Sequence, residues 1–115
     1  MHELSLAHSV MEIVGREMEK YPSRHLKSIE LTIGTHAGVE TEAFRTAIKA
    51  VMRSSLWPDA EAVIVTVAAD AQCIACGARF APDGYIPQCP ECGSAMCGIV
   101  AGNEFRVSAL TLHDT

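Results

Sequence analysis

The chain has 115 residues, of which 49% are hydrophobic and 20% are charged, and its formal net charge is −5. This size predicts one globular domain, or one domain with a small appended module. The acidic balance and the scattered Lys and Arg residues argue against nucleic-acid binding, which depends on clustered basic side chains. The sequence has no apolar run of about 18 residues and no signal-peptide pattern, so we expect a cytoplasmic protein that is not associated with a membrane.

The first predicted element is an amphipathic helix over residues 4–20. Apolar side chains recur there at helical spacing, while charged side chains cover the opposite face. The sequence Tyr21-Pro22-Ser23 ends this helix. The residues expected to face the core are Leu6, Val10, Ile13, Val14 and Met18.

A strand, a second helix and another strand follow. Residues 28–33 alternate between polar and apolar side chains, as in a half-buried strand. The helix is expected to begin near Thr41 as N-cap, with Glu42 in its first turn. Residues 62–67 read as a buried strand, so this segment predicts a right-handed βαβ unit. The apolar stripe of the second helix consists of Phe44, Ala47, Ile48 and Val51.

Residues 70–98 differ in character from the rest of the chain, because they are rich in Cys and Gly and show little periodicity. Residues 105–112 then read as a third strand, whose alternation slips between Ala109 and Leu110. The predicted fold is therefore α/β, with two helices on a small three-stranded mixed sheet. Residues 1–69 and 99–115 form this unit, and residues 70–98 are an inserted zinc-ribbon-like module.

The inserted module carries two cysteine pairs, Cys73 with Cys76 and Cys89 with Cys92, each followed by a glycine. Two intervening residues let both thiolates of a pair face one cation, and the glycine permits the positive φ of a tight turn. Four thiolates suit a tetrahedral Zn²⁺ ion and leave it no open position. The predicted zinc site is therefore structural, and its binding energy helps to fold a segment that has little core of its own.

Other interpretations of these cysteines remain open. Two disulfides are disfavoured in a reducing compartment. A single iron, as in rubredoxins, is a competing occupant, although only Phe80 and Tyr85 supply aromatic rings within the module. Cys97 is the fifth cysteine. It is interpreted as a free thiol, with exchange into the metal site or oxidation as alternatives.

The chain begins Met1-His2-Glu3, which places an imidazole directly after the terminal residue. The Met1 amine, the His2 amide and the His2 imidazole offer three nitrogen donors in sequence. Ni²⁺ and Cu²⁺ favour such nitrogen donors in square-planar geometry. A solvated, unliganded His2 is the competing interpretation on these residues alone. The other histidines, His8, His25, His36 and His113, have no evident partner in the sequence and are expected at the surface.

Several segments together resemble the HypA/HybF family of hydrogenase maturation proteins, which are nickel metallochaperones. They are MHELSLA, LTIGTHAGVETEAF, CIACG, CPECGS and GNEFRV, and they extend over the whole chain. The resemblance implies transient Ni²⁺ binding through His2, with Met1 and Glu3 contributing, and structural Zn²⁺ on Cys73, Cys76, Cys89 and Cys92.

The resemblance also implies a function without catalysis. The protein would act with a nickel-insertion GTPase to deliver Ni²⁺ to the large subunit of [NiFe] hydrogenase, as a monomer or homodimer. Glu40 stands where the family commonly has an aspartate, which leaves open its role as a further nickel donor. The alternative function is a zinc-ribbon interaction module with no preference for nickel.

Overall fold

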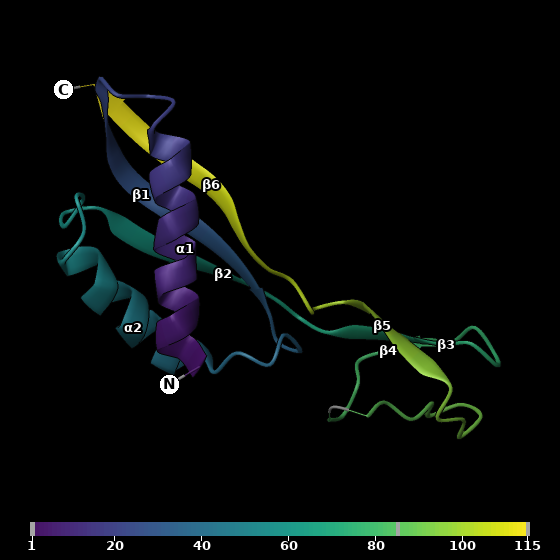
Figure 1. The fold of residues 1–115 in the computed structure, drawn as a ribbon. Coiled ribbons are helices and arrows are strands. Elements are labelled where there is room, and N and C mark those ends of the chain that lie inside the picture. Colours follow the sequence, from purple (N-terminus) through teal and green to yellow (C-terminus); the bar gives the residue numbers. More distant parts are fainter. Residues whose placement is uncertain (1, 85, 115) are drawn as a thin grey trace. The chain divides into compact units, whose positions relative to one another are not determined.

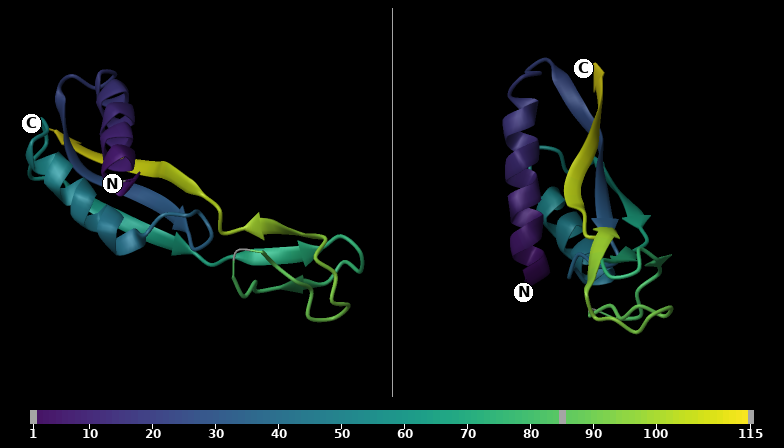
Figure 2. Two further views of the ribbon diagram at one scale, coloured as in Figure 1. Left: turned by 60° about the horizontal axis from the view of Figure 1, so that its bottom comes forward. Right: turned by 90° about the vertical axis from the view of Figure 1, so that its right-hand side faces the viewer.

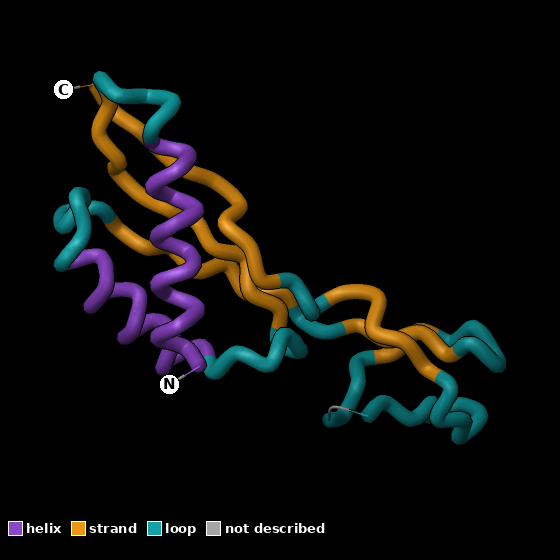
Figure 3. The backbone as a smooth tube through the Cα atoms, viewed as in Figure 1, coloured by secondary structure: helices purple, strands orange, loops and turns teal. Residues whose placement is uncertain are grey.

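The structure is a computed structural model that describes residues 2–84 and 86–114. The chain forms two compact units. Unit 1 comprises Met1–Thr32, Val39–Val65 and Arg106–Thr115, and unit 2 comprises Ile33–Gly38 and Thr66–Phe105. Both helices belong to unit 1, whereas the described part of unit 2 consists of strands and loops (Figures 1 and 3).

Unit 1 is built on a three-stranded sheet in the order β2-β1-β6. Strands β1 and β2 run in the same direction and β6 runs against them (Figure 2). The mixed sheet predicted from the sequence is therefore confirmed, and α2 connects its two parallel strands. The elements are α1 (His2–Met18), β1 (Arg24–Gly34), α2 (Thr41–Arg53), β2 (Glu61–Val67) and β6 (Phe105–Asp114).

Both helices cover the same face of this sheet and pack against each other (Figure 2). The central strand β1 supplies most of the buried sheet residues, because it has a neighbour on each side. Burial of these aliphatic and aromatic side chains is the main stabilising contribution to the unit. The core includes Val14 from α1, Ile29 and Leu31 from β1, and Phe44 and Ile48 from α2.

Residues 62–67 form a strand as predicted, but the prediction that this strand is buried is wrong. Strand β2 lies at the edge of the sheet, and Val63 and Val65 are 44% and 41% exposed. The helices cover only one face, so alternate β2 side chains point to solvent. Ile13, expected in the core, is likewise 51% exposed.

The helix boundaries also differ from those expected. Helix α1 covers His2–Met18, so it begins and ends two residues earlier than the predicted helix over residues 4–20. The first N–H groups of a helix have no partner within the helix, so water can satisfy them at an exposed end, and the Glu3 carboxylate in the first turn is stabilised by the positive end of the helix dipole. Helix α2 is capped by Glu40 rather than Thr41, because the Glu40 carboxylate reaches the Ala43 N–H at 2.7 Å.

Unit 2 contains a second sheet that the periodicity of the sequence did not indicate. Its strands pair antiparallel in the order β4-β3-β5. They are short and interrupted by cysteine turns, so no alternation is long enough to be recognised. They are β3 (Asp70–Cys73), β4 (Arg79–Phe80) and β5 (Cys97–Ala101).

Within unit 2, the end of β1 lies against the loop that precedes β6. The Gly34 N–H donates to the Glu104 carbonyl at 2.7 Å, and the His36 N–H donates to the Gly102 carbonyl at 2.7 Å. A Cβ atom on Gly34 would lie 1.9 Å from the Gly102 oxygen. Only glycine permits this approach of the two backbones.

Candidate metal centres

The four cysteines of the paired motifs come together in unit 2. Their Sγ atoms all lie within 4.8 Å of one another. The Sγ atoms of Cys73 and Cys92 are 3.6 Å apart, as are those of Cys76 and Cys89. A tetrahedral zinc ion with Zn–S bonds of about 2.3 Å places its sulfurs about 3.8 Å apart. The cluster therefore fits structural zinc, and four sulfurs leave no position for a substrate.

Each cysteine pair forms the same turn. The Gly77 N–H donates to the Cys73 carbonyl at 2.9 Å, and the Gly93 N–H donates to the Cys89 carbonyl at 2.9 Å. The two glycines have φ values of +80° and +77°, which other residues rarely adopt. The CxxCG spacing thus has a direct backbone explanation at both pairs.

Two glutamines that the sequence analysis did not identify brace these turns. Gln72 Nε2 donates to the Gly77 carbonyl at 3.4 Å, and Gln88 Nε2 donates to the Gly93 carbonyl at 3.1 Å. Each glutamine directly precedes the first cysteine of its pair, so the repeated unit is QCxxCG. The repeat of a glutamine before each cysteine pair is the sequence signal from which these residues could have been identified.

The thiols of the cluster divide into two kinds. The Cys76 N–H lowers the pKa of Cys73 to about 6. The Cys92 N–H likewise lowers the pKa of Cys89, and the N–H of Cys92 lies 3.5 Å from the Cys89 sulfur. Hydrogen bonding of this kind favours the thiolate. The first cysteine of each pair is therefore the stronger acid.

The second cysteine of each pair is the weaker acid. The Ala78 N–H favours the Cys76 thiolate, but the hydrogen bond to Cys89 and burial outweigh it and raise the pKa of Cys76 to about 12. At Cys92 the Ser94 N–H also favours the thiolate, but the hydrogen bond with Cys73 and burial outweigh it, so the pKa of Cys92 is raised. Without metal, each weak acid therefore donates to the thiolate across the cluster.

Cys97 lies opposite Cys73 in the pairing of β3 with β5. Its thiol donates to the Ser94 carbonyl at 3.5 Å, and burial is the main cause that raises its pKa. Cys97 is not a member of the group of four mutually close sulfurs in the described structure. This position agrees with the interpretation of Cys97 as a free thiol.

The second set of predicted ligands lies at the start of α1. His2 is the first residue of this helix and is exposed, and Glu3 follows it half-buried. Met1, the third member of the set, lies outside the described residues. The His2 and Glu3 amides belong to the first turn, whose N–H groups have no partner within a helix. The helix itself therefore supplies no acceptor for the His2 amide.

Glu3 joins the starts of the two helices. Its Oε2 atom accepts a hydrogen bond from the Glu40 N–H at 3.2 Å, and the Glu40 carboxylate in turn caps α2. The Glu40 N–H is the main cause that lowers the pKa of Glu3, and the His2 imidazole contributes to the same direction. A carboxylate is therefore held in the charged form next to His2.

The remaining histidines have different surroundings. His8 is exposed and lines a groove with Leu4 and Ala50, and His36 is half-buried. His25 and His113, which have no evident partner in the sequence, are both exposed and lie with their rings 5.7 Å apart.

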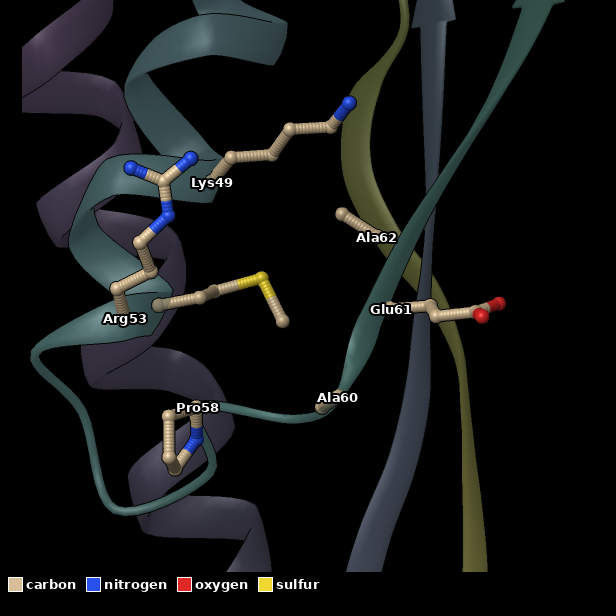
Figure 4. Close-up of a pocket in the computed structure, with 7 residues that line it drawn as sticks. Lys49, Arg53, Pro58, Ala60, Glu61 and Ala62 are labelled. Carbon is tan, nitrogen blue, oxygen red and sulfur yellow. The ribbon is translucent and has the colours of Figure 1, made fainter.

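A separate pocket lies between the end of α2 and the start of β2 (Figure 4). Lys49 and Arg53 extend from α2 beside it, whereas the Glu61 carboxylate points away from both (Figure 4). The two cationic side chains repel a metal ion. This pocket is therefore not a further metal centre.

The chain is similar to known proteins over its whole length. Residues 1–112 match the family model described as "Hydrogenase/urease nickel incorporation, metallochaperone, hypA". The hydrogenase maturation factor HypA of Prosthecochloris aestuarii is 37% identical over 113 residues, covering 98% of this chain and 100% of the relative. HypA of Chlorobium limicola is 35% identical over 114 residues, covering 99% and 98% of the two chains.

Solved structures share the fold. The solution structure of the Ni metallochaperone HypA from Helicobacter pylori aligns with a TM-score of 0.68 at 23% identity, covering 98% of each chain. A solution structure titled as HypA protein aligns with a TM-score of 0.70 at 25% identity, covering 98% of this chain and 97% of the other. The match of family model, relatives and fold over the whole length shows that this chain belongs to the HypA family of nickel metallochaperones for hydrogenase maturation.

Proposed function

We propose that this protein binds Ni²⁺ at its N-terminus and hands it to a [NiFe] hydrogenase during maturation. The observation that carries the proposal is the position of His2, which is exposed at the first residue of α1 and followed by the Glu3 carboxylate. The His2 imidazole, the amides of the first turn and the Met1 amine are the donors that Ni²⁺ prefers. Cys73, Cys76, Cys89 and Cys92 hold Zn²⁺ in the same proposal.

The two donor sets suit different tasks. Zinc bound by four thiolates has a complete coordination shell and exchanges little, which suits a structural role. The N-terminal set is incomplete, so a ligand from another protein can join the ion and draw it away. Membership of a metallochaperone family supports delivery rather than catalysis, and we propose that the protein is not an enzyme.

The proposed partners follow from the same family. They are the nickel-insertion GTPase of the maturation system and the hydrogenase large subunit, and the protein acts as a monomer or homodimer. The net charge of −5 supports a role without nucleic acid. No described helix has the length and apolar character needed to cross a membrane. We propose that delivery takes place in the cytoplasm.

Nickel titration of untagged, zinc-loaded protein tests the proposal. We expect one N-terminal nickel site that is lost in His2→Ala and in a variant with a few residues added before Met1. Zinc content and the circular dichroism spectrum should stay unchanged in both variants, because an exposed terminal residue contributes little packing. His8→Ala, which removes another exposed imidazole of α1, is the matched control.

Unchanged nickel affinity in both the His2→Ala and the extended variant would contradict N-terminal nickel binding. It would favour the alternative function, a zinc-ribbon interaction module. In that case nickel would show no preference over zinc for any part of the chain. The colour of the purified protein distinguishes iron from zinc in the cysteine cluster, since iron bound by four thiolates is red whereas zinc is colourless.

A further inference from the structure

Two histidines that are far apart in the sequence lie together at one end of the sheet of unit 1. His25 is near the start of β1 and His113 near the end of β6, and their ring centroids are 5.7 Å apart with the rings tilted by 30°. We propose that His25 and His113 form a binding site for an imidazole-preferring divalent transition metal, separate from the His2 motif and from the four cysteines.

The pairing of the two strands accounts for this arrangement. Arg24 Nε forms an ion pair with Asp114 Oδ1 at 3.1 Å, and Ser108 Oγ lies 2.9 Å from a Glu30 carboxylate oxygen. Each step forward along β1 therefore corresponds to one step back along β6, as antiparallel neighbours require. In this register His25 stands directly opposite His113. Directly opposed side chains of such strands are close enough to share a ligand.

The ring separation fits a shared metal ion. A bond of about 2.1 Å from each imidazole nitrogen puts two ring centroids about 5 to 6.5 Å apart on one ion, depending on the angle between the bonds. The observed 5.7 Å lies inside this range. The two rings therefore lie at a separation that one shared ion can span.

One of the two rings is already oriented. His113 Nδ1 lies 3.2 Å from the Asp114 carbonyl oxygen, so this nitrogen donates its proton. The tautomer that does so leaves the lone pair on Nε2 for a metal. Histidines that bind metals typically donate their other ring N–H to a carbonyl or carboxylate in this way.

The surroundings of the pair favour a cation. His25 and His113 line a pocket together with Asp59 and Trp57 from the loop between α2 and β2. Asp59 adds negative charge at the pocket, and the nearby Arg24 is neutralised by its ion pair with Asp114. The four cysteines are the one described group of three or more metal-binding side chains, so water would complete the shell around the histidine pair.

The pocket contains its own reporter and lies apart from the N-terminal motif. Trp57 is the single tryptophan of the chain. Glu3 contacts the start of α2, whereas Trp57 follows the end of this helix, and its 13 residues span about 20 Å. Quenching of Trp57 fluorescence by Ni²⁺ or Cu²⁺ therefore reports the pocket in preference to His2.

The test is a Ni²⁺ and Cu²⁺ titration of untagged, zinc-loaded protein, followed by Trp57 fluorescence. We expect saturable quenching in the natural sequence and in His2→Ala. His25→Ala and His113→Ala should each weaken the metal affinity more than about tenfold, since removal of even an outer-shell partner typically has an effect of this size. His8→Ala should bind as the natural sequence does.

Quenching that persists with unchanged affinity in both His25→Ala and His113→Ala overturns the site. Loss of the quenching in His2→Ala would also contradict the His25–His113 site, because the metal would then bind only at the N-terminus. Failure of the nickel delivery proposal appears instead as unchanged N-terminal binding in His2→Ala, so the two outcomes are distinguishable. Circular dichroism confirms folding, which substitution of exposed side chains leaves intact.

Discussion

The Glu3 carboxylate accepts a hydrogen bond from the Glu40 backbone N–H at 3.2 Å. This contact joins the first turn of α1, which carries His2, to the residue that caps α2. The N-terminal motif is thus tied to the start of α2, although His2 itself is exposed. Residues at the end of a chain are otherwise often poorly ordered.

Removal of the Glu3 side chain should loosen this link. We expect faster hydrogen exchange of the Glu40 amide in Glu3→Ala, because its N–H loses an acceptor, and an intermediate rate in Glu3→Gln, whose carbonyl still accepts. Nickel should bind more weakly in both variants, because the negative charge next to His2 is gone. Amide exchange followed by nuclear magnetic resonance and nickel titration measure the two effects. Glu12→Ala, which removes an α1 carboxylate that pairs with Arg16, serves as the control.

Glu40 should act mainly as a helix cap. Its Oε2 atom accepts from the Ala43 N–H at 2.7 Å, so Glu40→Ala should lower the free energy of unfolding by about 1 kcal/mol. Glu40→Asp should retain the stability, since aspartate is itself a favoured N-cap. Urea denaturation followed by the helical circular dichroism signal measures both variants. A loss of nickel affinity in Glu40→Ala as large as that in His2→Ala would instead identify Glu40 as a nickel ligand.

The two glutamines of the QCxxCG turns should slow the release of zinc. Gln72→Ala and Gln88→Ala each remove a donor to a glycine carbonyl, and we expect zinc transfer to a chromogenic chelator to accelerate by up to about tenfold. The effect should be larger for Gln88, whose hydrogen bond is 3.1 Å against 3.4 Å. Equal transfer rates in both variants and the natural sequence would show that the backbone turns hold the site unaided.

Zinc binding should release protons at neutral pH. In the metal-free cluster the raised pKa values of Cys76 and Cys92 keep these thiols protonated, whereas Cys73, with a pKa of about 6, favours the thiolate at pH 7. All four cysteines must be thiolates to bind zinc, so we expect release of about two to three protons at pH 7. Zinc affinity should therefore rise with pH through the neutral range. Calorimetry in buffers of different ionisation enthalpy measures the number released; a value near four would contradict the lowered pKa of Cys73.

Local patterns in the sequence were sufficient for the helices and for the chemistry of the cysteines. Helical periodicity placed Val10, Val14 and Met18 on one face, and all three are buried. The spacing CxxCG predicts a metal-binding turn because both thiols and the glycine belong to one short stretch of backbone. These features depend on neighbours within a few residues of each other.

The tertiary structure alone decided the features that join distant segments. Strand order placed β2 at the edge of the sheet and left Val63 and Val65 partly exposed. Packing of α1 beside α2 brought Glu3 to Glu40. The pairing of β1 with β6 placed His25 opposite His113. No local pattern encodes such contacts, because they depend on which segments the burial of the whole core brings together.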